Sequence, residues 1–276
     1  MAVRSHYQPL RQDRTKDTFR LFDLQPGKPG EPITGQLRIA EVPDNGHANA
    51  TDPYEAVSYT WGPKHPRFPI LLGAWPFLVR KNLWDFLRRI RHPTETLTLW
   101  IDAICINQSD LEERAYQVSL MSSVFTGAQH VLVWLGKAES YSHAAMHIIK
   151  EIAEQRRGGR ITENEMWSLF RWSMKDYWSR TWVVQEFLLA FDLVILCGKW
   201  KLPWNTLRAF MLRVNGNLLR TPGWSKAAPP MFNMSPAYAL LEQRANESSV
   251  TAPLLTLLER NSQSLSRDPR DKIYAM

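Results

Sequence analysis

The chain has 276 residues, of which 44% are hydrophobic and 22% charged, and its formal net charge is +7. This length suffices for one large or two small domains, and no apolar run reaches the roughly 20 residues of a membrane-spanning helix. The basic residues are scattered rather than interleaved with aromatic residues, so we expect no nucleic-acid partner, although the charge suits nucleotide phosphates. Without a secretory signal pattern, Cys105 and Cys197 are expected to be reduced, buried thiols in a cytoplasmic protein.

The first third of the chain reads as short strands around one helix. Residues 1–18 are polar, and we expect them to be flexible. Short apolar runs bounded by turn residues then predict strands at 19–24, 35–42 and 54–59 and a hairpin over 68–79. Apolar residues recur at helical spacing from 82 to 90, which predicts an amphipathic helix.

The middle of the chain alternates strands with helices. Strands are predicted at 97–106, 130–135 and 193–197, and helices at 111–125, 141–155 and 167–190. Ser109 and Glu112 have the spacing of a capping box at the start of the 111–125 helix. Such alternation predicts an α/β core over 19–200 with a mostly parallel sheet, helices on both faces, and the N-terminal strands and hairpin at one edge. Residues 201–276 show no strand pattern and are expected to be a helical C-terminal part.

The apolar run 97–106 contains one carboxylate, that of Asp102. An unpaired carboxylate in a buried strand costs several kcal/mol, roughly, so Asp102 needs a partner or a function. Ligands of open α/β sheets bind at the carboxyl ends of strands, which makes Asp102, Asn107 and Gln108 candidate binding residues. The alternative is a structural carboxylate that loop N–H groups satisfy.

A second candidate segment follows the strand at 54–59 and contains Tyr59, Thr60, Trp61 and Gly62. Gly62 permits close approach of the backbone to a nucleotide, and Trp61 has the shape to stack on a base. The alternative is a buried turn with Trp61 in the core. The sequence contains neither GxGxxG nor GxxxxGK[ST], so neither a dinucleotide-dependent oxidoreductase nor a P-loop enzyme is indicated.

Metal and thiol chemistry find little support. His143 and His147 are spaced i,i+4, but no HExxH accompanies them, so we predict no metal site and no cofactor. Cys105 lies inside a predicted buried strand, where a thiol stays protonated and makes a poor nucleophile.

Five motifs, in this order, resemble the fungal heterokaryon-incompatibility (HET) domain. They are YEAVSYTWG at 54–62, LWIDAICINQ at 99–108, VWLG at 133–136, RTWVVQE at 180–186 and DPRDKIYA at 268–275. The resemblance covers roughly residues 17–276 and implies a role in non-self recognition and programmed cell death in filamentous fungi. It also implies self-association and contacts with other incompatibility or NLR-like proteins. Family members usually continue beyond the position of Met276, so we expect a truncated or short form.

HET domains are in turn similar to Toll/interleukin-1 receptor (TIR) domains, which have a flavodoxin-like sheet. The strands at 54–59 and 97–106, the helix at 82–90 and the loop at 108–112 follow the TIR order, whereas the 68–79 hairpin is an insertion. Residues 179–187 resemble the TIR stretch of Ser, Trp and Glu that carries the catalytic glutamate of NAD-cleaving members, although Thr181 and Val183 depart from it. The resemblance implies that Glu186 is the catalytic residue of an NAD(P)+ glycohydrolase.

Glu186 suits that chemistry, because a carboxylate stabilises the oxocarbenium-like state of glycosidic cleavage or activates water. On a helix it lies one turn after Trp182, which becomes a candidate substrate-binding residue. The alternative is that Glu186 pairs with Arg180 or another buried cation.

Two functions follow from these alternatives. The first is a cell-death effector that cleaves NAD, and the second is a non-catalytic scaffold that oligomerises and recruits partners. A pocket that holds Glu186, Asp102 and Trp61 together favours the enzyme. A salt-bridged Glu186 shielded from solvent favours the scaffold.

Overall fold

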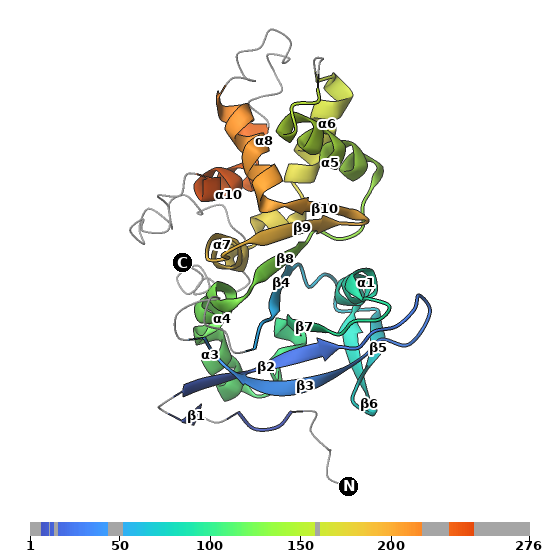
Figure 1. Ribbon diagram of the computed structural model, residues 1–276, viewed down its shortest axis with the longest axis vertical. Coiled ribbons are helices and arrows are strands. Elements are labelled where there is room, and N and C mark those ends of the chain that lie inside the picture. The colour runs from blue at the N-terminus through green and yellow to red at the C-terminus, as the bar shows by residue number, and fades with distance from the viewer. Residues whose placement is uncertain are drawn as a thin grey trace. The chain divides into compact units, whose positions relative to one another are not determined.

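The computed structural model describes residues 7–10, 12–13, 16–43, 52–157, 161–216 and 232–245. The chain forms two compact units (Figure 1). Unit 1 comprises residues 1–136 and 190–192, and unit 2 comprises residues 137–189 and 193–276. No helix within the described ranges has both the length and the apolar character that crossing a membrane requires.

Three parallel strands form one side of the sheet of unit 1. β4 (Glu55–Tyr59) lies between β8 (His130–Trp134) and β7 (Leu97–Trp100) and runs parallel to both. β4 and β8 are buried along almost their whole length, as their apolar runs predict for central strands. This part of the sheet agrees with the predicted parallel arrangement.

The sheet continues beyond β7 with the N-terminal strands and the hairpin, in the order β7-β2-β3-β5-β6 (Figure 1). β2 (Lys16–Leu24) is antiparallel to both β7 and β3 (Thr34–Glu41). β5 (Arg67–Leu72) is parallel to β3 and forms an antiparallel hairpin with β6 (Trp75–Arg80). The two-residue strand β1 (Gln12–Asp13) pairs with β2. This unit therefore has a mixed sheet.

The prediction of a mostly parallel, TIR-like sheet is wrong, although the α/β class is correct. A short connection suffices to join antiparallel neighbours, whereas parallel neighbours need a long crossover, and only nine residues separate β2 from β3. Phe19, Leu21 and Phe22 of β2 are each 0% exposed, so burial of both faces holds this strand against β7. Local periodicity predicts such a strand but not the direction in which it pairs.

The helices of unit 1 confirm one prediction and correct two others. α1 (Lys81–Ile90) buries Leu83, Phe86 and Leu87 as expected. The strand predicted over 97–106 ends at Trp100, because the backbone turns into α2 (Asp102–Cys105). The helix predicted over 111–125 is divided at Leu120 into α3 (Leu111–Ser119) and α4 (Met121–Gly127).

The N-cap of α3 is Asp110 rather than Ser109. The Asp110 carboxylate accepts hydrogen bonds from the backbone N–H groups of Glu112 and Glu113. The Ser109 hydroxyl instead donates to Asn107 Oδ1 at 2.9 Å, so it is not available to the helix. The capping-box prediction for Ser109 and Glu112 is therefore wrong.

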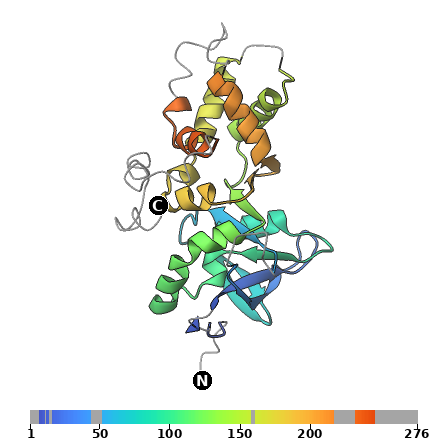
Figure 2. The ribbon, with the colours of Figure 1, turned by 60° about the vertical axis from the view of Figure 1, so that its left-hand side comes forward.

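Unit 2 consists mainly of helices, which Figure 2 shows packed side by side. They are α5 (Ser140–Ala153), α6 (Glu163–Ser173), the 3-10 helix η2 (Asp176–Ser179), α7 (Thr181–Leu188), α8 (Trp204–Gly216) and α10 (Pro236–Ala245). The helix predicted over 167–190 is thus three elements. β9 (Leu193–Cys197) forms a hairpin with β10 (Trp200–Pro203), a strand where only helix was expected. The motif DPRDKIYA at 268–275 lies outside the described residues.

Candidate ligand-binding site

Unit 1 contains a cavity of about 210 Å³ at the end of β4. It brings together four of the residues predicted from the sequence, namely Tyr59, Trp61, Asn107 and Gln108. The β5–β6 hairpin, α1 and α2 add two arginines and several apolar side chains, and Tyr7 and Ser109 also line the cavity. The carboxyl end of β4 and the turn after α2 thus meet at one site. The strand-end argument accounts for Tyr59 and Trp61, whereas Asn107 and Gln108 follow α2 rather than a strand.

Trp61 is half-buried at this cavity and is held from two sides. Its Nε1 donates a hydrogen bond to Asp102 Oδ2 at 2.7 Å. The Arg80 guanidinium lies over its ring, with Cζ 4.8 Å from the centroid, and donates to the Gly62 carbonyl oxygen at 2.8 Å. Trp61 is therefore a fixed part of the cavity wall rather than a core residue.

Asp102 is the first residue of α2, not a mid-strand carboxylate. Its Oδ1 accepts the backbone N–H of Ala103 at 2.7 Å, and its Oδ2 accepts the Trp61 indole. Its donors are thus one N–H of α2 and one side chain rather than loop N–H groups, and the binding role of Asp102 stays a prediction. These bonds give Asp102 a specific effect, because the carboxylate sets the position of Trp61.

Thr60 and Gly62 shape the turn after β4 but are not among the residues that line the cavity. Asn82 joins this turn to β8, since its Nδ2 donates to the Thr60 carbonyl oxygen at 2.6 Å and its Oδ1 accepts from Trp134 Nε1 at 2.9 Å. Gly62 has φ +69°, a conformation that glycine adopts without strain. The sequence analysis did not predict a role for Asn82. The only indication in the sequence is that a polar residue stands at the start of a predicted helix.

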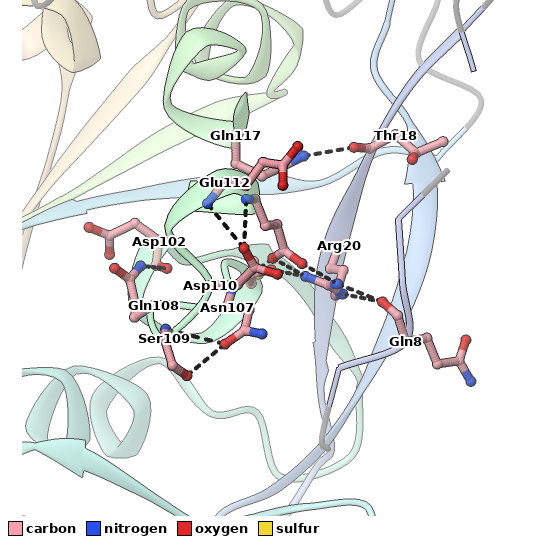
Figure 3. A network of polar contacts seen from close by, with 12 residues as sticks. Gln8, Thr18, Arg20, Asp102, Asn107, Gln108, Ser109, Asp110, Glu112 and Gln117 are labelled. Atoms are coloured by element: carbon pink, nitrogen blue, oxygen red, sulfur yellow. Dashed lines mark hydrogen bonds and ion pairs between the residues drawn. The ribbon is translucent and has the colours of Figure 1, made fainter. Parts of the chain in front are cut away.

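The ion pair of Arg20 with Glu113 supports the Asn107–Asp110 loop. Figure 3 shows Arg20 beside this loop. Arg20 is 1% exposed, and its NH1 lies 2.6 Å from Glu113 Oε1. The same oxygen accepts the backbone N–H of Asn107 at 2.8 Å. Burial acts to raise the pKa of Glu113, but the hydrogen bonds and charge of Arg20 and the Asn107 N–H outweigh it, so that pKa is lowered. The sequence analysis did not predict this ion pair, although Arg20 is a charged residue within the apolar run of β2.

Glu186 and Trp182 belong to α7 of unit 2. Glu186 is 5% exposed, and its Oε2 lies 4.0 Å from Arg180 NH1. This shielded ion pair is the arrangement expected of a structural carboxylate. That Glu186 shares a ligand with Trp61 and Asp102 stays a prediction.

Metal and thiol chemistry have no visible basis in the described ranges. No cluster of three or more His, Cys, Asp or Glu side chains there is placed to hold a metal ion. Cys105 lies in α2 rather than in a strand, and burial raises the pKa of its thiol to about 12. The thiol is therefore protonated at neutral pH.

Comparisons with known proteins match part of this chain to a protein family and to one relative. Residues 54–186 match the family model described as heterokaryon incompatibility protein (HET). The chain is 29% identical over 194 residues to heterokaryon incompatibility protein 6, OR allele, of Neurospora crassa. That match covers 52% of this chain and 28% of the relative, so the chain spans less than a third of the relative's length. No solved structure matches the chain significantly.

Proposed function

Because residues 54–186 match the family model described as heterokaryon incompatibility protein (HET), we propose that this chain acts in fungal heterokaryon incompatibility. The observation that carries the proposal is the family match, which the similarity to heterokaryon incompatibility protein 6 supports. The motifs YEAVSYTWG and LWIDAICINQ supply the Trp61 and Asn107 walls of the cavity in unit 1. We therefore assign ligand recognition at this cavity to the domain, in a cytoplasmic protein that self-associates and engages other incompatibility or NLR-like proteins.

Expression of the chain in a filamentous fungus tests this role. We expect cell death in fused or expressing cells, and we expect Trp61→Ala to abolish it because the cavity loses one wall. Trp167→Ala is the matched control, since Trp167 is 47% exposed on α6 and is not among the residues that line the cavity. A wild-type chain without effect on viability or on incompatibility would refute the proposal.

The finer proposal is that killing proceeds by hydrolysis of NAD(P)+. Water would attack the anomeric carbon, the nicotinamide–ribose bond would break, and neutral nicotinamide would leave with the bond's electron pair. Glu186 would stabilise the oxocarbenium-like state or accept the proton of water. The order of the TIR-like motifs supports this mechanism, as does the burial of Glu186 on α7, where it is 5% exposed.

The scaffold alternative is supported by the ion pair between Glu186 and Arg180, and the geometry of Glu186 favours it. Two variants separate the mechanisms. If Glu186 is structural, Glu186→Gln and Arg180→Gln should lower the melting temperature alike, since each removes one member of the same ion pair. If Glu186 is catalytic, Glu186→Gln alone should lower nicotinamide release by about 10²–10⁴-fold, with folding preserved.

The readouts are nicotinamide release from NAD and thermal melting of the same protein. Wild-type protein that kills cells without releasing nicotinamide would refute the enzymatic mechanism and support the scaffold. If a stable Glu186→Gln variant neither kills cells nor releases nicotinamide, the scaffold mechanism is refuted.

A further inference from the structure

We propose that the cavity of unit 1 binds the phosphate group of a small organic phosphate through a pair of arginines, Arg67 and Arg80. This inference deepens the ligand site of the proposed function and rests on that part of it. It concerns residues that the sequence motifs do not include.

Arg67 and Arg80 are directly opposite each other in the β5–β6 hairpin. Directly opposite residues of an antiparallel pair project to the same face, with Cβ atoms about 4.5–5.5 Å apart, and like charges there destabilise the pair. Both side chains line the cavity, and none of the lining residues is acidic. The hairpin therefore concentrates two positive charges on one wall.

No carboxylate in the described part of the chain offsets these two charges through an ion pair. Other arginines of the protein are neutralised in this way, since Arg20 pairs with Glu113 and Arg38 with Asp23. A like-charged pair that the fold maintains next to a cavity is the arrangement expected where an external anion supplies the missing negative charge.

The two guanidinium groups are arranged differently. Arg80 is held in place by its hydrogen bond to the Gly62 carbonyl oxygen and by its packing over the Trp61 ring. Arg67 is exposed, and its Nε reaches the Lys64 carbonyl oxygen only at 3.4 Å. Its terminal nitrogens are thus available to a ligand. One fixed and one adjustable guanidinium suit bidentate contacts to phosphate oxygens.

The remaining walls limit the rest of the ligand. Asn107 and Gln108 offer amide groups, while Phe77 and Leu83 offer apolar surface. The cavity, at about 210 Å³, is smaller than the roughly 300–1,000 Å³ of sites for drug-sized ligands. It therefore suits a small organic phosphate, such as the phosphate and sugar of a mononucleotide.

Thermal melting and calorimetry of the full chain with AMP, adenosine and inorganic phosphate test the inference. AMP at about 100 times its Kd should raise the melting temperature by several degrees, and adenosine should not. Inorganic phosphate should bind more weakly and compete with AMP. Binding should weaken as salt is added, because the contacts are charged.

Arg67→Gln should weaken AMP binding by about 10-fold or more, since a hydrogen bond to a charged group is lost. Without ligand its melting temperature should equal or exceed that of the wild type, because the repulsion from Arg80 is relieved. Arg88→Gln is the matched control, because it removes the same charge from α1, where Arg88 packs on Trp84 and does not line the cavity. It should bind AMP like the wild type.

Three results would overturn the inference. They are an absence of binding by every phosphate probe, binding of adenosine as strong as that of AMP, and equal weakening by Arg67→Gln and Arg88→Gln. The binding assay needs neither killing nor NAD cleavage. AMP binding by a chain without effect in fungal cells would therefore refute the proposed function alone, whereas killing without phosphate binding would refute this inference alone.

Discussion

Replacement of Glu113 by Gln should destabilise unit 1, because it leaves the Arg20 guanidinium buried without its carboxylate. Arg20 is 1% exposed and donates to both Glu113 oxygens, at 2.6 and 2.9 Å. Removing one partner of a buried ion pair costs about 3–5 kcal/mol. The carbonyl oxygens of Gln8 and Cys105 still accept from Arg20, so we expect the lower end of that range, about 3 kcal/mol.

At about 2–4 °C per kcal/mol for a protein of this size, the melting temperature at pH 7 should fall by about 6–12 °C. The loss should depend on pH. The pKa of Glu113 is lower in the folded protein than its ordinary value of 4.5, so its stabilisation is complete above that value and disappears as the pH falls through the lowered pKa. The difference between wild type and Glu113→Gln should therefore narrow below about pH 4.

Glu112→Gln is the matched control, since it removes the same charge from the exposed face of the same helical turn. We expect it to change stability by less than about 0.5 kcal/mol. Hydrogen exchange of the Asn107 amide should accelerate in Glu113→Gln, because Glu113 accepts that N–H. Equal melting temperatures for the two variants at pH 7, or a difference that persists at low pH, would contradict the reasoning.

Three further predictions follow from local geometry. Asp110→Ala should lower the free energy of unfolding by about 1 kcal/mol in chemical denaturation, because Asp110 caps α3, and Ser109→Ala should lower it clearly less. Equal losses of unfolding free energy in the two variants would contradict this cap. Gly62→Ala should lower the free energy of unfolding by about 1 kcal/mol, because the backbone at this position has φ +69°, which strains a residue with a side chain. An unchanged denaturation midpoint would contradict this expectation. Iodoacetamide at pH 8 should label Cys105 only after unfolding, since its thiol pKa is about 12; mass spectrometry of the native protein checks this.

The sequence by itself determined the elements whose residues repeat with a clear local period. β4, β8, β9 and α1 lie within one or two residues of the predicted positions, and the 68–79 hairpin forms around Gly73. The alternation of apolar and polar residues in strands and their spacing in helices depend only on nearby residues in the chain, so the sequence alone predicts these elements. The HET-like motifs at 54–62, 99–108, 133–136 and 180–186 fall within the residues that match the HET family model, and the ends of two predicted strands pointed to Tyr59, Trp61, Asn107 and Gln108.

Only the tertiary structure decided which distant groups meet. Residue patterns in β2 are the same in either pairing direction, so its antiparallel placement beside β7 depends on packing of the whole sheet. The sequence offers both Ser109 and Asp110 as N-cap of α3. Asp110 takes this position, and the Ser109 hydroxyl donates a hydrogen bond to Asn107 instead. Arg20 and Glu113 form an ion pair although they are 93 residues apart in the chain. A hydrogen bond between residues so distant does not produce a repeating pattern in the sequence, so the sequence does not predict it.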